Sequence, residues 1–141
     1  MICGIDPGKT GAIALLYPDG KAYIEDMPVL GKEINGASIA STFEAFPPDH
    51  AYLHLMGRQS AFNFGQGVGV LKGVMAALRI PYTLISPAKW KASYSLNRDK
   101  DASRLLATRL FPESAEHFER KKDDGRAEAL LIAKYGSELN G

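Results

Sequence analysis

The sequence contains a single cysteine, no long apolar run and, across residues 50–98, no acidic residue. Cys3 alone excludes an internal disulfide and a cysteine-based zinc cluster, and such a composition is typical of a reducing compartment. No apolar run approaches the ~20 residues that span a bilayer, and the first residues carry no signal-peptide pattern. We therefore expect a cytoplasmic protein with no membrane partner.

The composition that is present is that of a globular protein. The 141 residues are 45% hydrophobic and 23% charged, which predicts one domain over residues 1–141 with a buried core. The net charge of +1 conceals an uneven distribution, since residues 58–122 hold 12 basic and 5 acidic residues while both flanking segments are acidic. This pattern indicates either a basic face for a polyanion beside an acidic pocket, or an ordinary solvated surface.

Hydrophobic periodicity and turn residues predict a mixed α/β order. Three strands joined by short turns form an antiparallel meander, two more strands follow, and helices lie between and after them. The strands are expected at 1–6, 12–17, 21–27, 51–56 and 81–85, and the helices at 38–46, 62–78, 100–110 and 124–135. Residues 28–36 are expected to form a loop.

Two helices carry more specific expectations. In the helix at 100–110, Leu105, Leu106 and Leu110 are expected to face the core. In the helix at 62–78, glycines recur at every fourth position, and such a row predicts a close backbone contact, either with the sheet or across a dimer.

The acidic residues suggest a metal site but also have ordinary explanations. Asp6 ends an apolar strand before Pro7-Gly8, where its carboxylate would either bind a divalent cation or form the turn. Asp124 and Glu128 share one face near the start of a helix, either around a cation or as an N-cap and a solvated side chain. Gly8-Lys9-Thr10 is not a P-loop, because the required glycine five positions earlier is Cys3.

The basic middle of the chain could bind phosphates. Lysines that flank an aromatic residue, as in Lys89-Trp90-Lys91, suit a nucleic-acid backbone with a stacked base or sugar. Trp90 could instead be a core residue. The other candidates are Lys100, Arg104, Lys121 and Lys122.

Five segments, in this order, resemble the RuvC-type Holliday junction resolvases, especially their bacteriophage and poxvirus-like branch. The resemblance covers residues 2–136 and rests on Gly4-Ile5-Asp6-Pro7-Gly8, Phe62-Asn63-Phe64-Gly65, Pro87-Ala88-Lys89-Trp90-Lys91, Lys100-Asp101-Ala102-Ser103-Arg104 and Lys121–Leu131. It implies an RNase H-like fold, a five-stranded mixed sheet whose first three strands are antiparallel, flanked by helices. It also implies a homodimer that binds a four-way DNA junction and nicks two strands.

The resemblance also implies site residues. The family holds Mg²⁺ or Mn²⁺ with four acidic residues, of which Asp6, Asp124 and Glu128 match three, with Asp123 as a substitute for Asp124. Two ions about 4 Å apart would support phosphodiester hydrolysis. The basic residues above would hold phosphates, while Phe62 or Phe64 would wedge at the junction or lie in the core.

The fourth acidic position of the family falls on His54, a departure that no shift of alignment removes because residues 50–98 lack acids. A neutral histidine can bind Mn²⁺ or another transition metal but suits Mg²⁺ poorly. His54 is therefore either a ligand that favours Mn²⁺ or the mark of a weakened or inactive site. The second case predicts a junction-binding protein without nuclease activity.

A different class also shares the opening motif. Gly4–Thr10 resembles the first phosphate loop of actin-like ATPases and sugar kinases. Those proteins need two such domains and a second glycine-rich phosphate loop, neither of which this sequence provides.

Overall fold

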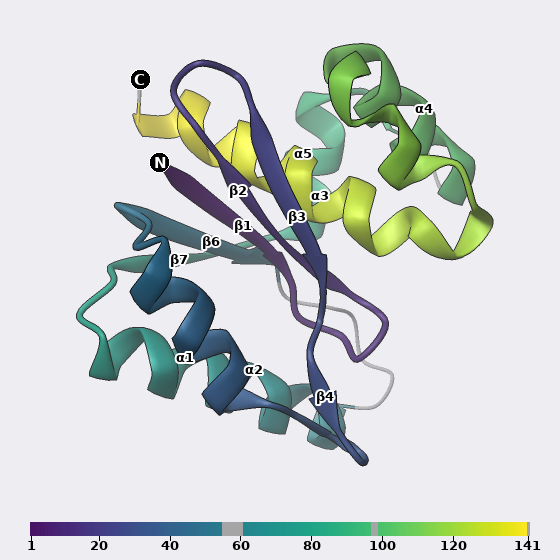
Figure 1. Cartoon of the computed structure of the whole chain (residues 1–141). Helices are drawn as coiled ribbons and strands as arrows, with labels where there is room; N and C mark the ends of the chain where they lie inside the picture. Colours follow the sequence, from purple (N-terminus) through teal and green to yellow (C-terminus); the bar gives the residue numbers. More distant parts are fainter. Residues whose placement is uncertain (55–60, 97–98, 141) are drawn as a thin grey trace.

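A central five-stranded sheet organises the molecule (Figure 1). The computed structural model describes residues 1–54, 61–96 and 99–140, with the backbone alone at 61–64, 100 and 140. The strand order is β3-β2-β1-β6-β7; β1, β2 and β3 are antiparallel, while β6 runs parallel to β1 and to β7. The strands are β1 (Ile2–Asp6), β2 (Ala12–Leu16), β3 (Ala22–Asp26), β6 (His50–His54) and β7 (Tyr82–Ile85).

Helices cover both faces of the sheet (Figure 1). α1 (Gly36–Ala45) and α2 (Ala61–Ala77) lie on one face, while α5 (Asp124–Asn140) crosses the other together with α4 (Lys100–Leu110). Local signals set these boundaries: Asn35 accepts a hydrogen bond from the Ser38 amide at the start of α1, and Asp99 caps α4 through the Asp101 amide. Among the described residues, no helix combines the length and the apolar character needed to cross a membrane.

Side chains alternate between the two hydrophobic layers, as the pleat of a strand requires. On β1, Cys3 and Ile5 point into the layer under α1 and α2, whereas on β2 Ala12 and Ala14 point toward α5. β2 is buried along its whole length because helices cover it on both sides. Successive residues of a strand therefore point to opposite faces, and this alternation determines which side chains contact Asp6.

The expected fold is confirmed, with additions and corrections in its details. The segment 28–36 is not a plain loop, since it holds the two-residue strands β4 (Val29–Leu30) and β5 (Glu33–Ile34). Short elements not expected from the sequence precede the last helix, namely α3 (Pro87–Ser93) and the 3-10 turns η1 (Pro112–Phe118) and η2 (Lys121–Asp123). The expected extension of β6 to residue 56 lies outside the described residues.

One expectation about side-chain packing is wrong, and one of the two alternatives for the glycine row is excluded. Leu105 is 71% exposed and Leu110 is 37% exposed, so of the three leucines of α4 only Leu106 is buried. Gly65, Gly69 and Gly73 contact no part of the sheet, because a methyl group at any of them would meet no described atom within 4 Å. The internal explanation of this glycine row is therefore excluded for the part of the chain that the structure describes.

Candidate metal and nucleic-acid site

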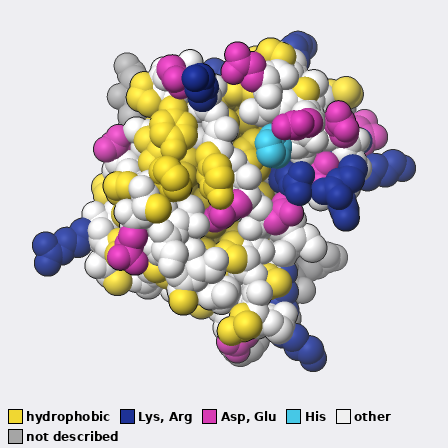
Figure 2. Space-filling model, in the orientation of Figure 1, with side chains coloured by type: hydrophobic (Ala, Val, Ile, Leu, Met, Phe, Trp, Pro, Cys, Tyr) yellow, Lys and Arg dark blue, Asp and Glu magenta, His cyan; other side chains and the backbone are white. Residues whose placement is uncertain are grey.

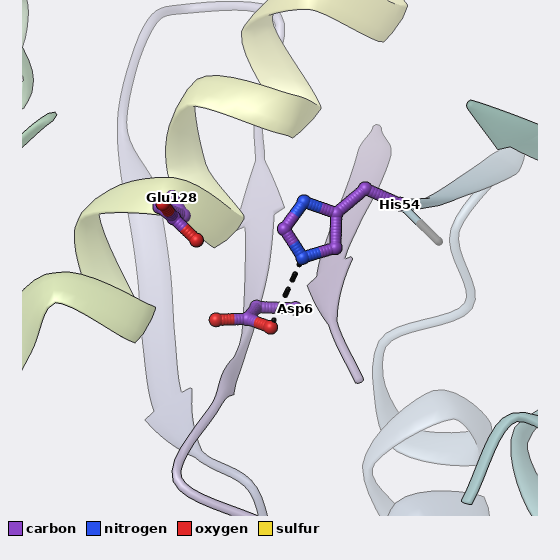
Figure 3. Close-up of side chains that lie close together, drawn as sticks. All are labelled: Asp6, His54 and Glu128. Atoms are coloured by element: carbon purple, nitrogen blue, oxygen red, sulfur yellow. Dashed lines mark hydrogen bonds and ion pairs between the residues drawn. The ribbon is translucent and has the colours of Figure 1, made fainter. Parts of the chain in front are cut away.

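Three elements bring Asp6, His54 and Glu128 together at one edge of the sheet. Asp6 is the last residue of β1 and His54 the last of β6, and two parallel neighbours end at the same edge. Glu128 reaches the same place from α5, so that the three side chains point toward one another (Figure 3). One ligand atom from each lies within 4.8 Å of the others. Of the four residues that the resemblance implied for the site, the structure thus brings three together and leaves out Asp124, and their role as ligands stays a prediction.

Small residues allow α5 to lie directly on the end of β1. A methyl group at Gly4 would overlap the backbone of Ala129 and Ala133, so only glycine fits there. Gly125, one turn before Glu128, sits 2.6 Å from the Thr10 carbonyl and 3.3 Å from Asp6 Oδ2, measured from the position a Cβ atom would take. The close approach places the first turns of α5 over the Asp6 carboxylate.

The site is largely shielded from water and contains opposed charges. Asp6 is 9% exposed and His54 is 3% exposed. Burial raises the pKa of Glu128, and the negative charge of Asp6 raises it further, while the Lys91 ammonium, 3.2 Å from Glu128 Oε1, acts in the opposite direction. A cation placed beside the two carboxylates would offset both the burial and the charge repulsion that raise the pKa of Glu128.

Both ring nitrogens of His54 have partners. Nε2 lies 3.2 Å from Asp6 Oδ1, and the Trp90 indole donates from Nε1 to His54 Nδ1 at 3.2 Å. Trp90 itself is fully buried. Its ring therefore belongs to the core, which confirms one of the two alternatives for Trp90, and it is not available to stack on a base or sugar.

The carboxylates fit the divalent cation that the sequence resemblance implies. Asp6 and Glu128 supply the hard oxygen ligands that Mg²⁺ and Mn²⁺ prefer. Burial and then the negative charge of Asp6 raise the pKa of Glu128, and such an ion would favour its ionised form. Beside Asp6 Oδ2, Gly125 leaves out the side chain that would otherwise cover it.

Asp123 and Asp124 occupy different positions at the entrance to α5. Asp123 is 1% exposed and accepts hydrogen bonds from the Arg120 amide and guanidinium, so it is a structural residue and not a substitute ligand. Asp124 is half-buried in the first turn of α5 and is not among the residues whose ligand atoms gather within 4.8 Å.

The predicted phosphate-binding residues fall into two groups. Lys89, Lys121 and Lys122 are exposed and available to a polyanion. Arg104 instead bonds to Asp101 and donates to the carbonyls of residues 118 and 119, which ties α4 to η1. Lys91 is paired with Glu128. The side chains of Phe62, Phe64 and Lys100 lie outside the described residues.

Basic side chains gather on the side of the molecule where the chain enters α5 (Figure 2). Arg120, Lys121 and Lys122 are exposed and directly precede the helix that carries Glu128. Positive charge therefore lies a few residues along the chain from the acidic site.

Sequence reasoning missed two contributors to the site region. The bond from Trp90 to His54 has no local signal, although a buried indole N–H always needs an acceptor. Arg126 joins α5 to β3 by pairing with Asp26 at 2.7 Å and 2.9 Å, and a basic residue two positions before Glu128 could have indicated such an anchor.

Comparison with known proteins identifies the fold. No family model and no curated protein sequence matches the chain. Among solved structures, RuvC of Thermus thermophilus superposes with a TM-score of 0.72 at 19% identity over 98% of this chain and 96% of that one. RuvC of T. thermophilus in complex with a Holliday junction substrate gives 0.71 at 18% identity, over 98% of this chain and 95% of that one.

A viral enzyme has the same architecture. The fowlpox virus resolvase, in a complex with Holliday junction DNA, superposes with a TM-score of 0.63 at 16% identity over 99% of both chains. The likeness spans almost the full length of each protein. The chain therefore has the RNase H-like fold of the RuvC-type Holliday junction resolvases.

Proposed function

We propose that the chain is a metal-dependent endonuclease that binds four-way DNA junctions and nicks them by phosphodiester hydrolysis, in DNA recombination or the processing of phage DNA. The observation that carries this proposal is the meeting of the Asp6 and Glu128 carboxylates at the sheet edge of a resolvase fold. Burial and the nearby charge of Asp6 both disfavour ionisation of Glu128, and a perturbed carboxylate beside a second one is typical of a functional site.

Asp6 and Glu128 would hold Mg²⁺ or Mn²⁺. A bound ion of this kind stabilises charge on the phosphate and lowers the pKa of an attacking water. Asp6 is held at the end of β1 by the packing of α5, and Glu128 is presented by that same helix. Asp124, at the start of α5, adds negative charge to the same end of the helix. His54 supplies no negative charge where the family has an acid, so a second cation would be held less tightly.

Exposed lysines would bind the DNA backbone. Lys89, Lys121 and Lys122 are the described candidates, and Lys100, Phe62 and Phe64 remain predictions from the sequence. Contacts to phosphates carry no base sequence, so the branched shape of a junction would dominate recognition. Symmetric nicking of two strands needs two sites, for which we propose a homodimer.

Cleavage assays on branched and linear DNA test this function. The wild-type chain is incubated with a four-way junction or with a duplex of the same sequence, in Mg²⁺ or Mn²⁺, while Asp6→Asn serves as the matched variant. We expect nicking of the junction alone and a loss on the order of 10²-fold or more in Asp6→Asn, because a cation ligand is removed. Junction binding without metal should persist in both proteins.

One observation favours a second candidate, a junction-binding protein with an inactive site. Lys91 already neutralises Glu128 at 3.2 Å, and His54 replaces an acid, so the site holds less negative charge than the family's. Junction binding without cleavage in either metal would select this function. Recovery of cleavage in His54→Glu would show that the missing charge was the cause, and absence of junction binding would contradict both candidates.

A further inference from the structure

His54 is buried between two groups with fixed hydrogen-bonding character. Its side chain lies between the Trp90 indole, 3.2 Å from Nδ1, and the Asp6 carboxylate, 3.2 Å from Nε2. An indole N–H can only donate, whereas an ionised carboxylate can only accept. The two neighbours therefore make opposite demands on the ring.

The two neighbours together determine which nitrogen of the His54 ring carries the hydrogen. Because Trp90 donates to Nδ1, that nitrogen must present its lone pair, and the single N–H of a neutral imidazole must lie on Nε2. Nε2–H then donates to Asp6 Oδ1. The other tautomer would set an N–H against the indole N–H and a lone pair against the carboxylate, and a doubly protonated ring would retain the first of these conflicts.

We infer that Trp90 fixes His54 as a hydrogen-bond donor that positions Asp6, and that His54 is not a metal ligand. A nitrogen that binds a metal must offer its lone pair. In the arrangement above, Nε2 carries the hydrogen and therefore offers no lone pair to a metal. The lone pair of Nδ1 faces Trp90. This role rests on the proposed function, since positioning Asp6 matters where its carboxylate binds a cation.

The bond from His54 also orients the Asp6 carboxylate. Oδ1 is held by His54 Nε2, while Oδ2 lies on the side of Gly125, 3.3 Å from where a Cβ of that residue would be. The second oxygen is thereby directed toward α5, the helix that carries Glu128. A hydrogen bond that fixes a ligand's orientation is typically worth 10–100-fold in metal affinity.

If the imidazole of His54 is not a metal ligand, the site should select among divalent cations. A site that offers only carboxylate oxygens suits Mg²⁺ and Mn²⁺, whereas an imidazole ligand would favour Ni²⁺ or Zn²⁺. Trp90 would thus act as a selectivity residue without touching the ion. Removing its N–H while keeping an aromatic ring should free His54 Nδ1 to carry the hydrogen and Nε2 to bind a metal.

The ring protons can be observed directly. Long-range ¹H–¹⁵N correlation spectra of the metal-free chain, labelled with ¹⁵N-histidine, distinguish the two tautomers, and His54→Gln identifies the His54 signals among the three histidines. We expect the Nε2–H form for His54. Observation of the Nδ1–H form would overturn the inference, and this result does not depend on nuclease activity or on DNA.

Metal titrations provide the second test. Calorimetry with Ni²⁺ compares the wild type, His54→Gln, Trp90→Phe and the double variant. We expect His54→Gln, whose amide can still donate to Asp6, to match the wild type within about threefold. Trp90→Phe should gain about tenfold or more in affinity, because the Nε2 lone pair of His54 becomes available to the metal, and this gain should vanish in the double variant.

The remaining outcomes are also decisive. A drop of more than about tenfold in His54→Gln with Trp90 intact would identify His54 as a ligand and overturn the inference. If Trp90→Phe does not fold, the tautomer of the wild-type chain decides alone. A confirmed tautomer in a chain that cleaves no junction would contradict the proposed function while leaving the assignment of His54 in place.

Discussion

At the scale of single residues, two adjacent aspartates before Glu128 have different surroundings. Asp123 is buried and bound by Arg120, whereas Asp124 lies half-buried in the first turn of α5. The order Arg-Lys-Lys-Asp-Asp in the sequence gives no means to decide which carboxylate folds back onto the arginine. The 3-10 turn η2 decides it, since it places Asp123 three residues after Arg120 in a reciprocal cap.

Replacement of Asp123 should change stability in a pH-dependent way. Burial opposes ionisation of Asp123, but hydrogen bonds from Arg120 and the charge of Arg126 outweigh it and hold its pKa below the ordinary value. The ionised side chain therefore contributes stability above about pH 3.9, the usual value for aspartate, which is lost as the pH falls through the lowered pKa. Asp123→Asn should lower the free energy of unfolding by about 1–3 kcal/mol at pH 7.

Urea unfolding at several pH values measures this effect. The difference between wild type and Asp123→Asn should be largest near neutral pH and shrink below about pH 4. Glu44→Gln, which changes an exposed carboxylate on α1, is the matched control and should show little difference. An undiminished difference in acid would mean that Asp123 acts through packing and not through its charge.

At the scale of elements, the contact between α5 and β1 determines where the site forms. Glu128 reaches Asp6 because no side chain at Gly4 separates the helix from the strand. Periodicity was enough to predict the longer helices and the sheet strands. It could not predict the hairpin of β4 and β5, since each has two residues, too few to show alternation.

The same reasoning explains the error on α4. Leu105 and Leu106 are neighbours on a helix and diverge by about 100°, so they face one core only where the apolar stripe is that wide. The structure buries Leu106 and exposes Leu105. The pairing of His54 with Trp90 was also beyond sequence reasoning, because it joins the end of β6 to α3, a short helix that the sequence did not predict.

Adding a methyl group at the contact between β1 and α5 should destabilise the fold. In Gly4→Ala the new atom would overlap backbone atoms of Ala129 and Ala133, which no side-chain rotation relieves. We expect a loss of at least about 3 kcal/mol in the free energy of unfolding, the upper part of the range for overpacked cores. Thermal and urea denaturation measure it.

Gly69→Ala is the matched control for this substitution. A methyl group there meets no described atom within 4 Å, and alanine favours the helical state of α2. The variant should gain about 0.5–1 kcal/mol. A loss of stability that depends on protein concentration would instead show that the glycine row contacts a second chain.

At the scale of the whole molecule, the uneven charge of the sequence becomes a localised feature. The formal net charge is only +1, yet exposed basic residues collect where the chain enters α5, next to the helix that carries Glu128 (Figure 2). The sequence predicted the basic middle of the chain. It could not show that Arg104 and Lys91 are engaged by carboxylates of the protein itself.

Junction binding should weaken with salt in proportion to the phosphates contacted. Lys121→Ala and Lys122→Ala should each lower the slope of log affinity against log salt by up to about 0.9, the value for one phosphate contact on duplex DNA. Electrophoretic or fluorescence titrations in EDTA measure this without cleavage. Lys134→Ala, which removes a lysine paired with Glu138 at 2.8 Å, should leave the slope unchanged.

The alternation of side chains along β6 determines which residue of this strand lies beside Asp6. Tyr52 and His54 point to the face of α5, while Leu53 points to the opposite layer. Insertion of one residue between Tyr52 and Leu53 would move Leu53 into the position of His54 and turn its hydrocarbon side chain toward Asp6. The register of β6 thus determines whether the carboxylate of Asp6 faces a hydrogen-bond donor or an apolar side chain.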